Sequence, residues 1–364
     1  MQAGLLNTYQ RSISTRGVTA VVVSVLLTVF YLLLYLPGSF YTPNFPDWLS
    51  PISDALHLPS KWYLYGLLYS IGMVVGGYFM LKKHGNSRYH KLRTVTLIAV
   101  QILLAFSLPL VLKVLGQPEY YLSYLWPLSY DKLFPGTLKE MPAFMAVYFV
   151  VGSLVAFPLL AYFKGKRFYC SWICGCGGLA ETFGDPWRHL SDKSAKAWRF
   201  EQVSLYTVLA LVLLLTGLMV ADAAGAAGDG HLRAIAEQTR GFYSFFIGAM
   251  FSGVLGVGLY PLMGTRVWCR FGCPMAALLG LVQKFGRFRI SVKKDMCISC
   301  GNCSAYCEMG IDVRQYAMAN LDIKRASCVG CGMCAHVCPR GVLKLETRAD
   351  HGPGAPVQEW VLDL

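Results

Sequence analysis

Six long apolar stretches constrain the fold more than any other feature of this 364-residue chain. They occupy roughly 18–36, 62–81, 94–115, 143–163, 203–222 and 242–263. A segment of about 20 apolar residues can cross a bilayer as a helix, because a helix satisfies its own backbone hydrogen bonds in lipid. The first stretch, "VTAVVVSVLLTVFYLLLYL", carries no charge and is too long for the core of a signal peptide. We therefore expect an α-helical integral membrane domain of six spans.

The basic residues predict how this domain is oriented. Only 15% of the chain is charged, whereas an ordinary globular domain has about 25%. Five Lys and Arg lie in 82–93, seven in 164–199 and thirteen after Gly264, while the alternate loops are poor in both. The positive-inside rule places the basic loops and both termini in the cytoplasm, here of a bacterial inner membrane. All thirteen cysteines fall on that reducing side, and the net charge of +13 follows this topology, so we expect no nucleic-acid partner.

Eight of the cysteines form two copies of one spacing near the C-terminus. Each copy reads C-x2-C-x2-C-x3-C, the pattern of bacterial ferredoxins with two [4Fe–4S] clusters. The fourth cysteine of each run ligates the other cluster in such proteins. The pattern therefore predicts a first cluster on Cys297, Cys300, Cys303 and Cys338, and a second on Cys328, Cys331, Cys334 and Cys307.

Neither a zinc site nor a disulfide framework explains these eight cysteines. Structural zinc takes four ligands, commonly as two separated C-x2-C pairs, and disulfides do not suit a reducing compartment. Gly301, Gly330 and Gly332 are expected to let the backbone approach a cluster closely. Glu308 departs from the pattern, because it follows Cys307 where Pro339 follows Cys338. We expect it to change the local turn and to add a negative charge without preventing ligation.

A second cysteine set lies where two of the spans end. "KRFYCSWICGCGG" follows the fourth span and "TRVWCRFGCPMAA" follows the sixth, so that Arg167 aligns with Arg266. Positions i and i+4 share a helix face, so two C-x3-C pairs brought together supply four thiolates. Three interpretations remain open: a third metal centre, a thiol pair with redox or copper chemistry, or inert buried thiols. The candidate ligands are Cys170, Cys174, Cys269 and Cys273, with Cys176 as an additional candidate.

Together these motifs resemble the polyferredoxin-type membrane 4Fe–4S proteins over roughly 140–345. That group includes the quinol dehydrogenase subunit of periplasmic nitrate reduction, the membrane regulator of nitrous oxide reductase and the accessory protein of cbb3 oxidase assembly. The resemblance implies electron transfer between the quinone pool and a partner redox protein within a larger complex. The second motif keeps the family's proline as Pro274, whereas the first has Gly175 there and adds Cys176.

The chain then divides into six regions. They are 1–163 with four membrane helices, 164–202 with the first cysteine motif and a linker, 203–263 with helices five and six, 264–286 with the second motif, 287–346 as a small α+β ferredoxin domain with two [4Fe–4S] clusters, and 347–364 as a tail. The linker 177–200 is expected either along the membrane surface or beneath the ferredoxin domain.

The membrane domain suggests a lipid-soluble partner, and a quinone or quinol is the first candidate. No histidine lies within a predicted span, which argues against an intramembrane haem. Acidic residues near span ends are candidates for proton transfer: Asp47, Asp54, Glu119, Asp131, Glu140 and Asp222. The function expected is therefore a membrane-bound iron–sulfur electron-transfer subunit. The alternative is a reductase or assembly factor that reduces Cu(II) to Cu(I), since soft thiolates favour Cu(I). The reaction would take place at the second cysteine set, called the membrane-face cysteines below: Cys170, Cys174, Cys176, Cys269 and Cys273.

Overall fold

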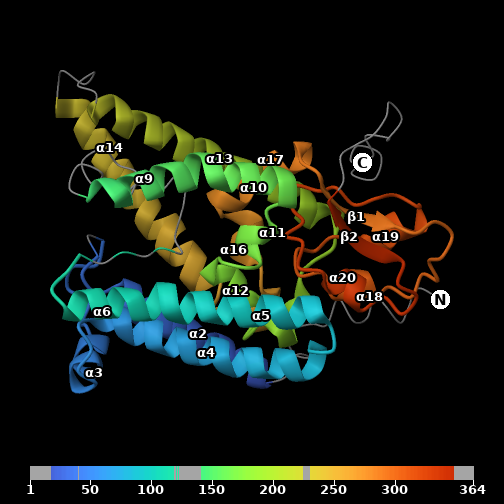
Figure 1. Ribbon diagram of the computed structural model, residues 1–364. Coiled ribbons are helices and arrows are strands. Elements are labelled where there is room, and N and C mark those ends of the chain that lie inside the picture. The colour runs from blue at the N-terminus through green and yellow to red at the C-terminus, as the bar shows by residue number, and fades with distance from the viewer. Residues whose placement is uncertain are drawn as a thin grey trace.

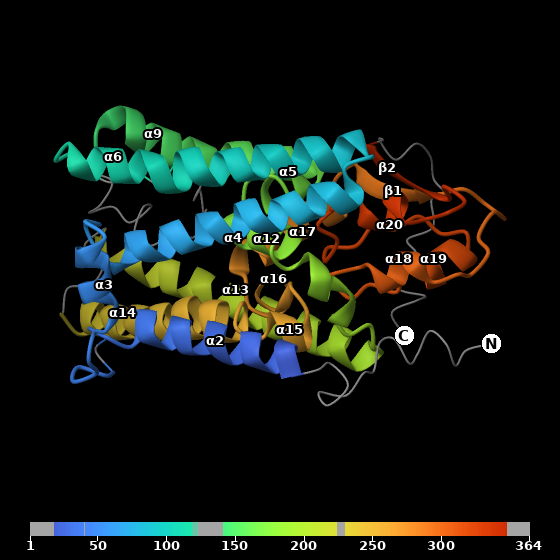
Figure 2. The same ribbon diagram turned by 90° about the horizontal axis from the view of Figure 1, so that it is seen from below.

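Five helices in the described part of the chain are long and apolar enough to cross a bilayer. This computed structural model describes residues 18–39, 41–118, 120, 122, 141–223 and 230–347. The five helices are α2 (Val18–Tyr35), α4 (Lys61–His84), the continuous helix α5–η2–α6 (Arg88–Val114), the continuous helix α9–η3–α10 (Ala143–Lys164) and α13 (Ala195–Ala223). They match the first five predicted spans. Figure 1 shows them side by side, and Figure 2 shows the same bundle after a quarter turn.

The sixth predicted span, 242–263, is not one helix. Helix α14 (Gly230–Phe242) continues as the π-helical segment η5 (Tyr243–Leu255), and a turn then leads to α15 (Tyr260–Met263). Glycines bring this region close to α2: a Cβ on Gly253 would lie 2.7 Å from Cδ1 of Tyr31. The apolar run is therefore divided between η5 and α15, and a sixth span remains a prediction.

Two of the long helices contain a π-helical segment that the apolar pattern does not reveal. Segment η2 (Gln101–Ser107) joins α5 (Arg88–Val100) to α6 (Leu108–Val114), and η3 (Gly152–Ala156) joins α9 (Ala143–Val151) to α10 (Phe157–Lys164). Proline follows each segment, at Pro109 and Pro158, and proline removes a backbone donor from a helix. Within η2, the buried Gln101 donates a side-chain hydrogen bond to the carbonyl of Ile173.

The C-terminal segment forms a small α+β unit at one end of the helices. Strand β1 (Phe288–Val292) pairs with β2 (Leu343–Thr347) in an antiparallel ladder with Ile290 opposite Leu345. Three short helices lie between the strands in sequence: α18 (Asn302–Ala305), α19 (Val313–Met318) and α20 (Met333–His336). Figures 1 and 2 show this orange-to-red unit at the end opposite α3 (Leu49–Ala55). The predicted small α+β domain is thus present.

Short elements carrying the membrane-face cysteines join the bundle to the C-terminal unit. They are α11 (Arg167–Cys170), α12 (Gly175–Glu181), η4 (Asp185–Leu190), α16 (Val267–Phe271) and α17 (Pro274–Phe285). Just beyond η4, the Ser191 hydroxyl donates a 2.6 Å hydrogen bond to the Glu308 carbonyl. Part of the linker 177–200 therefore contacts the ferredoxin unit, while its expected position along the membrane surface remains a prediction.

Candidate functional site

Two small cavities in the C-terminal unit are lined by the two cysteine sets that the spacing groups together. Cys297, Cys300, Cys303 and Cys338 line the first, and Cys307, Cys328, Cys331 and Cys334 line the second. In each cavity three sulfurs come from one run and the fourth from the other. Four thiols around an apolar cavity suit a [4Fe–4S] cluster by number and by donor type. The assignment of individual ligands stays a prediction.

Burial disfavours the thiolate form of most of these cysteines. It raises the pKa of Cys303 to about 12 and that of Cys328 to about 11. Burial also raises the pKa of Cys331 and Cys334 well above the usual thiol value, with neighbouring acids and thiols adding to the shift. A bound cation offsets this cost, because metal ligation requires the thiolate. Ligation of a cluster would thus hold these buried cysteines as thiolates, a form that burial alone disfavours.

Left-handed glycines shape the backbone at both cavities, as expected. Gly301, Gly330 and Gly332 have φ of 80°, 61° and 81°. A Cβ on Gly330 would lie 2.8 Å from Cβ of Arg167, and one on Gly332 would lie 2.8 Å from Cε1 of Tyr89. These glycines thus also permit close packing of the C-terminal unit against the helical part.

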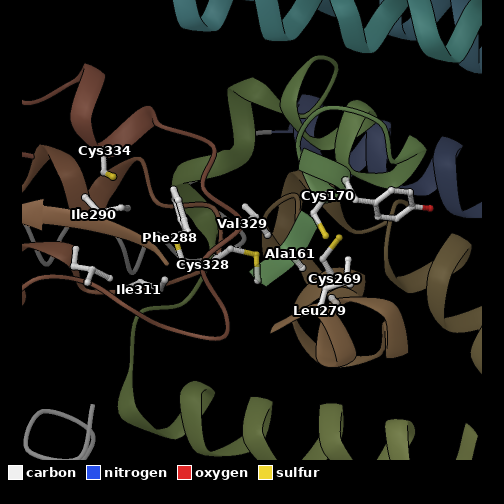
Figure 3. Packing of buried hydrophobic residues seen from close by; sticks show 14 of the residues in the cluster. Ala161, Cys170, Cys269, Leu279, Phe288, Ile290, Ile311, Cys328, Val329 and Cys334 are labelled. Carbon is white, nitrogen blue, oxygen red and sulfur yellow. The ribbon is translucent and has the colours of Figure 1, made fainter. Parts of the chain in front are cut away.

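The membrane-face cysteines are brought together, but not on a shared helix face. Cys170 ends α11, whereas Cys174 precedes α12; likewise Cys269 lies in α16, whereas Cys273 precedes α17. The expectation that each C-x3-C pair lies on one helix is therefore wrong, because both repeats break the helix between their cysteines. Figure 3 shows the sulfurs of Cys170 and Cys269 directed toward one another.

Electrostatic contacts link all five of these thiols. Burial raises the pKa of Cys170 to about 12, and charges on Cys174 and Cys269 add to the shift. The pKa values of Cys269 and Cys273 are also raised, mainly by burial. A hydrogen bond from Cys176 instead lowers the pKa of Cys174 to about 6. Cys176, which has no counterpart in the second repeat, thus belongs to the same group.

Arg266 connects this five-thiol group to the C-terminal unit. Its guanidinium lies 3.2 Å from the Cys170 carbonyl oxygen and 3.7 Å from Sγ of Cys269. The same group forms 3.0 Å ion pairs with Glu181 and with Glu308. Because Glu308 follows Cys307, one buried cation touches both the membrane-face thiols and the loop of the second cavity.

Further buried arginines complete this network. The guanidinium of Arg93 lies 2.7 Å from the Glu181 carboxylate. The guanidinium of Arg188 lies 3.4 Å from the Glu181 carboxylate and 2.8 Å from that of Asp185. Burial would raise the pKa of Glu181, but Arg93, Arg266 and Arg188 outweigh it and lower the pKa. Oxygens of Glu181 and Glu308 also lie within 4.8 Å of Sγ of Cys331, yet the arginines already neutralise these carboxylates.

The sequence did not predict this network, although it held two signals. Arg266 stands out in the repeat, and Glu308 departs from the ferredoxin pattern. The aligned Arg167 behaves differently, since its guanidinium stacks 4.7 Å from the ring centre of Phe288. The two repeats therefore share their C-x3-C pairs, but they differ in the role of the arginine and in the additional Cys176 of the first.

Comparisons with known proteins agree with these sites. The family model described as "4Fe-4S dicluster domain" matches residues 290–345, and the one described as "4Fe-4S binding domain" matches 141–196 and 245–293. The second model thus covers both membrane-face cysteine motifs. No solved structure matches the chain at a significant level.

Among curated proteins, the putative electron transport protein YccM of Escherichia coli is 28% identical over 44% of this chain and 46% of its own length. The methylamine utilization ferredoxin-type protein MauN of Paracoccus denitrificans is 31% identical over 43% of this chain and 53% of its own. MauN of Methylobacillus flagellatus is 25% identical over 50% and 59%. The chain thus spans about half the length of the curated relatives it matches.

The domain matches, the two four-thiol cavities and these relatives together identify the chain as a polyferredoxin-type 4Fe–4S protein.

Proposed function

We propose that this protein is a membrane-bound iron–sulfur electron-transfer subunit that exchanges electrons between a quinone pool and a partner redox protein. The observation that carries the proposal is that three cysteine-lined sites lie next to one another. The two cavities of the C-terminal unit and the five-thiol group lie in one buried cluster of side chains. A [4Fe–4S] cluster bound at each site would supply one-electron transfer.

The five-thiol group is proposed to hold a third iron–sulfur centre on Cys170, Cys174, Cys269 and Cys273. The match of a 4Fe–4S-binding family model to both motifs supports this assignment over inert thiols. Arg266 beside Cys269 would stabilise the negative charge of ligating thiolates. Cys176 would hold Cys174 through the hydrogen bond between them. Figure 3 shows Cys328 of the second cavity in the same region as Cys170 and Cys269.

A cavity of about 1050 Å³ supports a quinone as the lipid-soluble partner. It lies between the end of α2, the start of α4 and the helix α14–η5, at the end of the bundle away from the C-terminal unit. Ligand sites are typically apolar with a few polar groups. Tyr35, Trp62 and Phe245 supply ring surface here, and Glu237 supplies a carboxylate.

A row of tyrosines connects this cavity to the five-thiol group. Tyr35 stacks on Tyr31 at 5.9 Å, Tyr31 meets Tyr65 at 6.0 Å, and Tyr65 meets Tyr69 at 6.0 Å between ring centres. The Tyr69 hydroxyl donates a 2.9 Å hydrogen bond to the carbonyl of Gly175, between Cys174 and Cys176. A row of neighbouring side chains therefore runs from the cavity to the five-thiol group.

Of the acids considered for a quinone site, Asp47 and Asp54 are described and do not line this cavity. Asp47 is paired with Lys61 at 3.0 Å. Glu119, Asp131 and Glu140 lie outside the described residues, as does the side chain of Asp222. Glu237 lines the cavity and is the acid proposed here for proton exchange. The copper-reductase alternative has no support from the family models and relatives named above.

The test is reduction of the iron–sulfur centres by a quinol. In the anaerobic protein, an excess of quinol should bleach their visible absorbance. Ala249→Trp fills the cavity and should slow this reaction about tenfold, which corresponds to a loss of roughly 1.4 kcal/mol. Ala143→Trp on the exposed face of α9 is the matched control and should react as the wild type does. Equal rates in all three proteins would refute the quinone site, whereas no bleaching with any quinol would refute the quinone partner.

A further inference from the structure

Three histidines from distant parts of the sequence meet between the helices and the C-terminal unit. His84 ends α4, His90 lies in the first turn of α5, and His336 ends α20. Their ring centres lie 5.1 Å apart for His84 and His336, 4.7 Å for His90 and His336, and 6.4 Å for His84 and His90. Nothing in the electron-transfer proposal uses these three side chains.

These separations suit three imidazoles on one metal ion. With a zinc–nitrogen bond of about 2.0–2.1 Å and a tetrahedral angle, the ring centres should lie about 5 Å apart. Two of the three observed separations agree closely, and the third is somewhat longer. As the rings stand, their nitrogens do not all lie within 4.8 Å of one another. Metal binding therefore requires the rings to rotate so that one nitrogen of each is directed at a common point.

The nitrogens of two rings are available for such a site. Nε2 of His84 and Nε2 of His90 are buried and have no hydrogen-bond partner within the described residues. His84 is 7% exposed and His90 is 2% exposed. A buried polar atom without a partner destabilises the folded protein, and the uncoordinated trio has two such atoms.

A neighbouring hydroxyl selects which nitrogen of His90 can act as the ligand. Nδ1 of His90 lies 3.0 Å from the Ser87 hydroxyl. Histidine ligands commonly hold their second ring nitrogen in such a contact, which fixes the tautomer and leaves the other nitrogen free for metal. In His90 that free nitrogen is the unpartnered Nε2.

The charges around the trio are partly neutralised. Lys83, Arg93 and Arg188 lie on the same elements or pack against them, and they would repel a cation. Lys83 and Arg188 share Asp185, at 3.0 Å and 2.8 Å, and Arg93 pairs with Glu181 at 2.7 Å, so that two carboxylates face these three cations. Neutral imidazoles are also preferred ligands of zinc and similar ions.

We propose that His84, His90 and His336 bind a divalent transition-metal cation of the zinc class, with a water as fourth ligand. The cation would tie the C-terminal unit to the hairpin of α4 and α5, because His336 lies between Cys334 and Cys338 in the sequence. This site is separate from the cysteine sites and does not depend on the proposed electron-transfer role.

The test uses Zn²⁺ on the full-length, cluster-loaded protein under anaerobic conditions. After loading and desalting, zinc and iron are counted per chain in the wild type, His90→Gln and His336→Gln, with His189→Gln in η4 as the matched control. We expect about one zinc per chain in the wild type and the control, and zinc affinity lower by about tenfold or more in the other two, since each lacks one ligand. Unchanged zinc affinity in both variants, or no zinc in the wild type, would overturn the proposal.

A second measurement needs no variant. X-ray absorption at the zinc edge of the wild type should show only nitrogen or oxygen neighbours at about 2.0–2.1 Å. A sulfur shell at about 2.3 Å would place the zinc on cysteines instead and would equally overturn the proposal.

Discussion

Replacement of Arg266 by glutamine should lower the stability of the protein, because Arg266 contacts both the helical part and the C-terminal unit. Arg266 is 1% exposed and forms 3.0 Å ion pairs with Glu181 and Glu308. Removing one partner of a buried ion pair typically costs about 3–5 kcal/mol, because the other charge stays buried without compensation. Glu181 retains Arg93 at 2.7 Å, so we assign the cost to Glu308. Because Arg188 also attracts Glu308, we expect the lower end of this range, about 3 kcal/mol.

The double variant R266Q/E308Q separates this cause from general damage. It also removes the Glu308 carboxylate, which in R266Q has lost its ion pair with Arg266. It should therefore be more stable than R266Q alone by at least about 1 kcal/mol, within the usual range of coupling between contacting residues. Arg199→Gln, at an exposed position on α13, is the control and should change stability little.

The assay is chemical denaturation of the detergent-solubilised protein, followed by loss of the iron–sulfur absorbance. Unfolding with bound clusters is not two-state, so the midpoints are compared as apparent stabilities. We expect the order wild type, then R266Q/E308Q, then R266Q. A double variant no more stable than R266Q would refute the view that an uncompensated Glu308 causes the loss.

Three further outcomes follow from the same structure. Cys338→Ser and Cys307→Ser should each remove the electron paramagnetic resonance signal of a different reduced cluster, the first and the second respectively. Gly165→Ala should lower the apparent stability by about 1–3 kcal/mol and so reduce the denaturation midpoint. Gly165 has φ of 79°, and a Cβ there would lie 2.6 Å from Cγ of Phe288. Gly217→Ala adds a Cβ with no atom within 4 Å and should not lower the midpoint. Chelation of iron should expose the C-terminal unit to protease before the membrane helices, because its cavities are lined by thiols that ligation stabilises.

Hydropathy and cysteine spacing predicted the elements that depend on local sequence. The run predicted at 143–163 is the helix Ala143–Lys164, because a long and mostly apolar segment satisfies its own backbone hydrogen bonds as a helix. The ferredoxin spacing likewise grouped the cysteines that line each cavity. The helix is set by residues close together in the chain, and so are three of the four cysteines in each cavity; the fourth was assigned from the known cross-ligation of two-cluster ferredoxins.

Features set by three-dimensional packing could not be predicted in this way. The helix is interrupted between Cys170 and Cys174 and between Cys269 and Cys273. The C-x3-C spacing does not reveal these interruptions, because the same spacing would also fit two cysteines on one helix face. The pairing of Arg266 with Glu308 joins segments 42 residues apart, and its two residues lie in different predicted regions. Hydropathy also predicts one span over 242–263, although the structure divides this run between the π-helical Tyr243–Leu255 and the short helix Tyr260–Met263.

The number of iron and acid-labile sulfide atoms per chain tests most directly whether the helical part carries a redox centre of its own. The measurement uses anaerobically purified full-length protein. Three [4Fe–4S] clusters, with the third on the membrane-face cysteines, predict about twelve of each. A Cys269→Ser variant should then fall to about eight while keeping both ferredoxin clusters. About eight in the wild type would contradict a third cluster and would leave the membrane-face thiols outside the electron path.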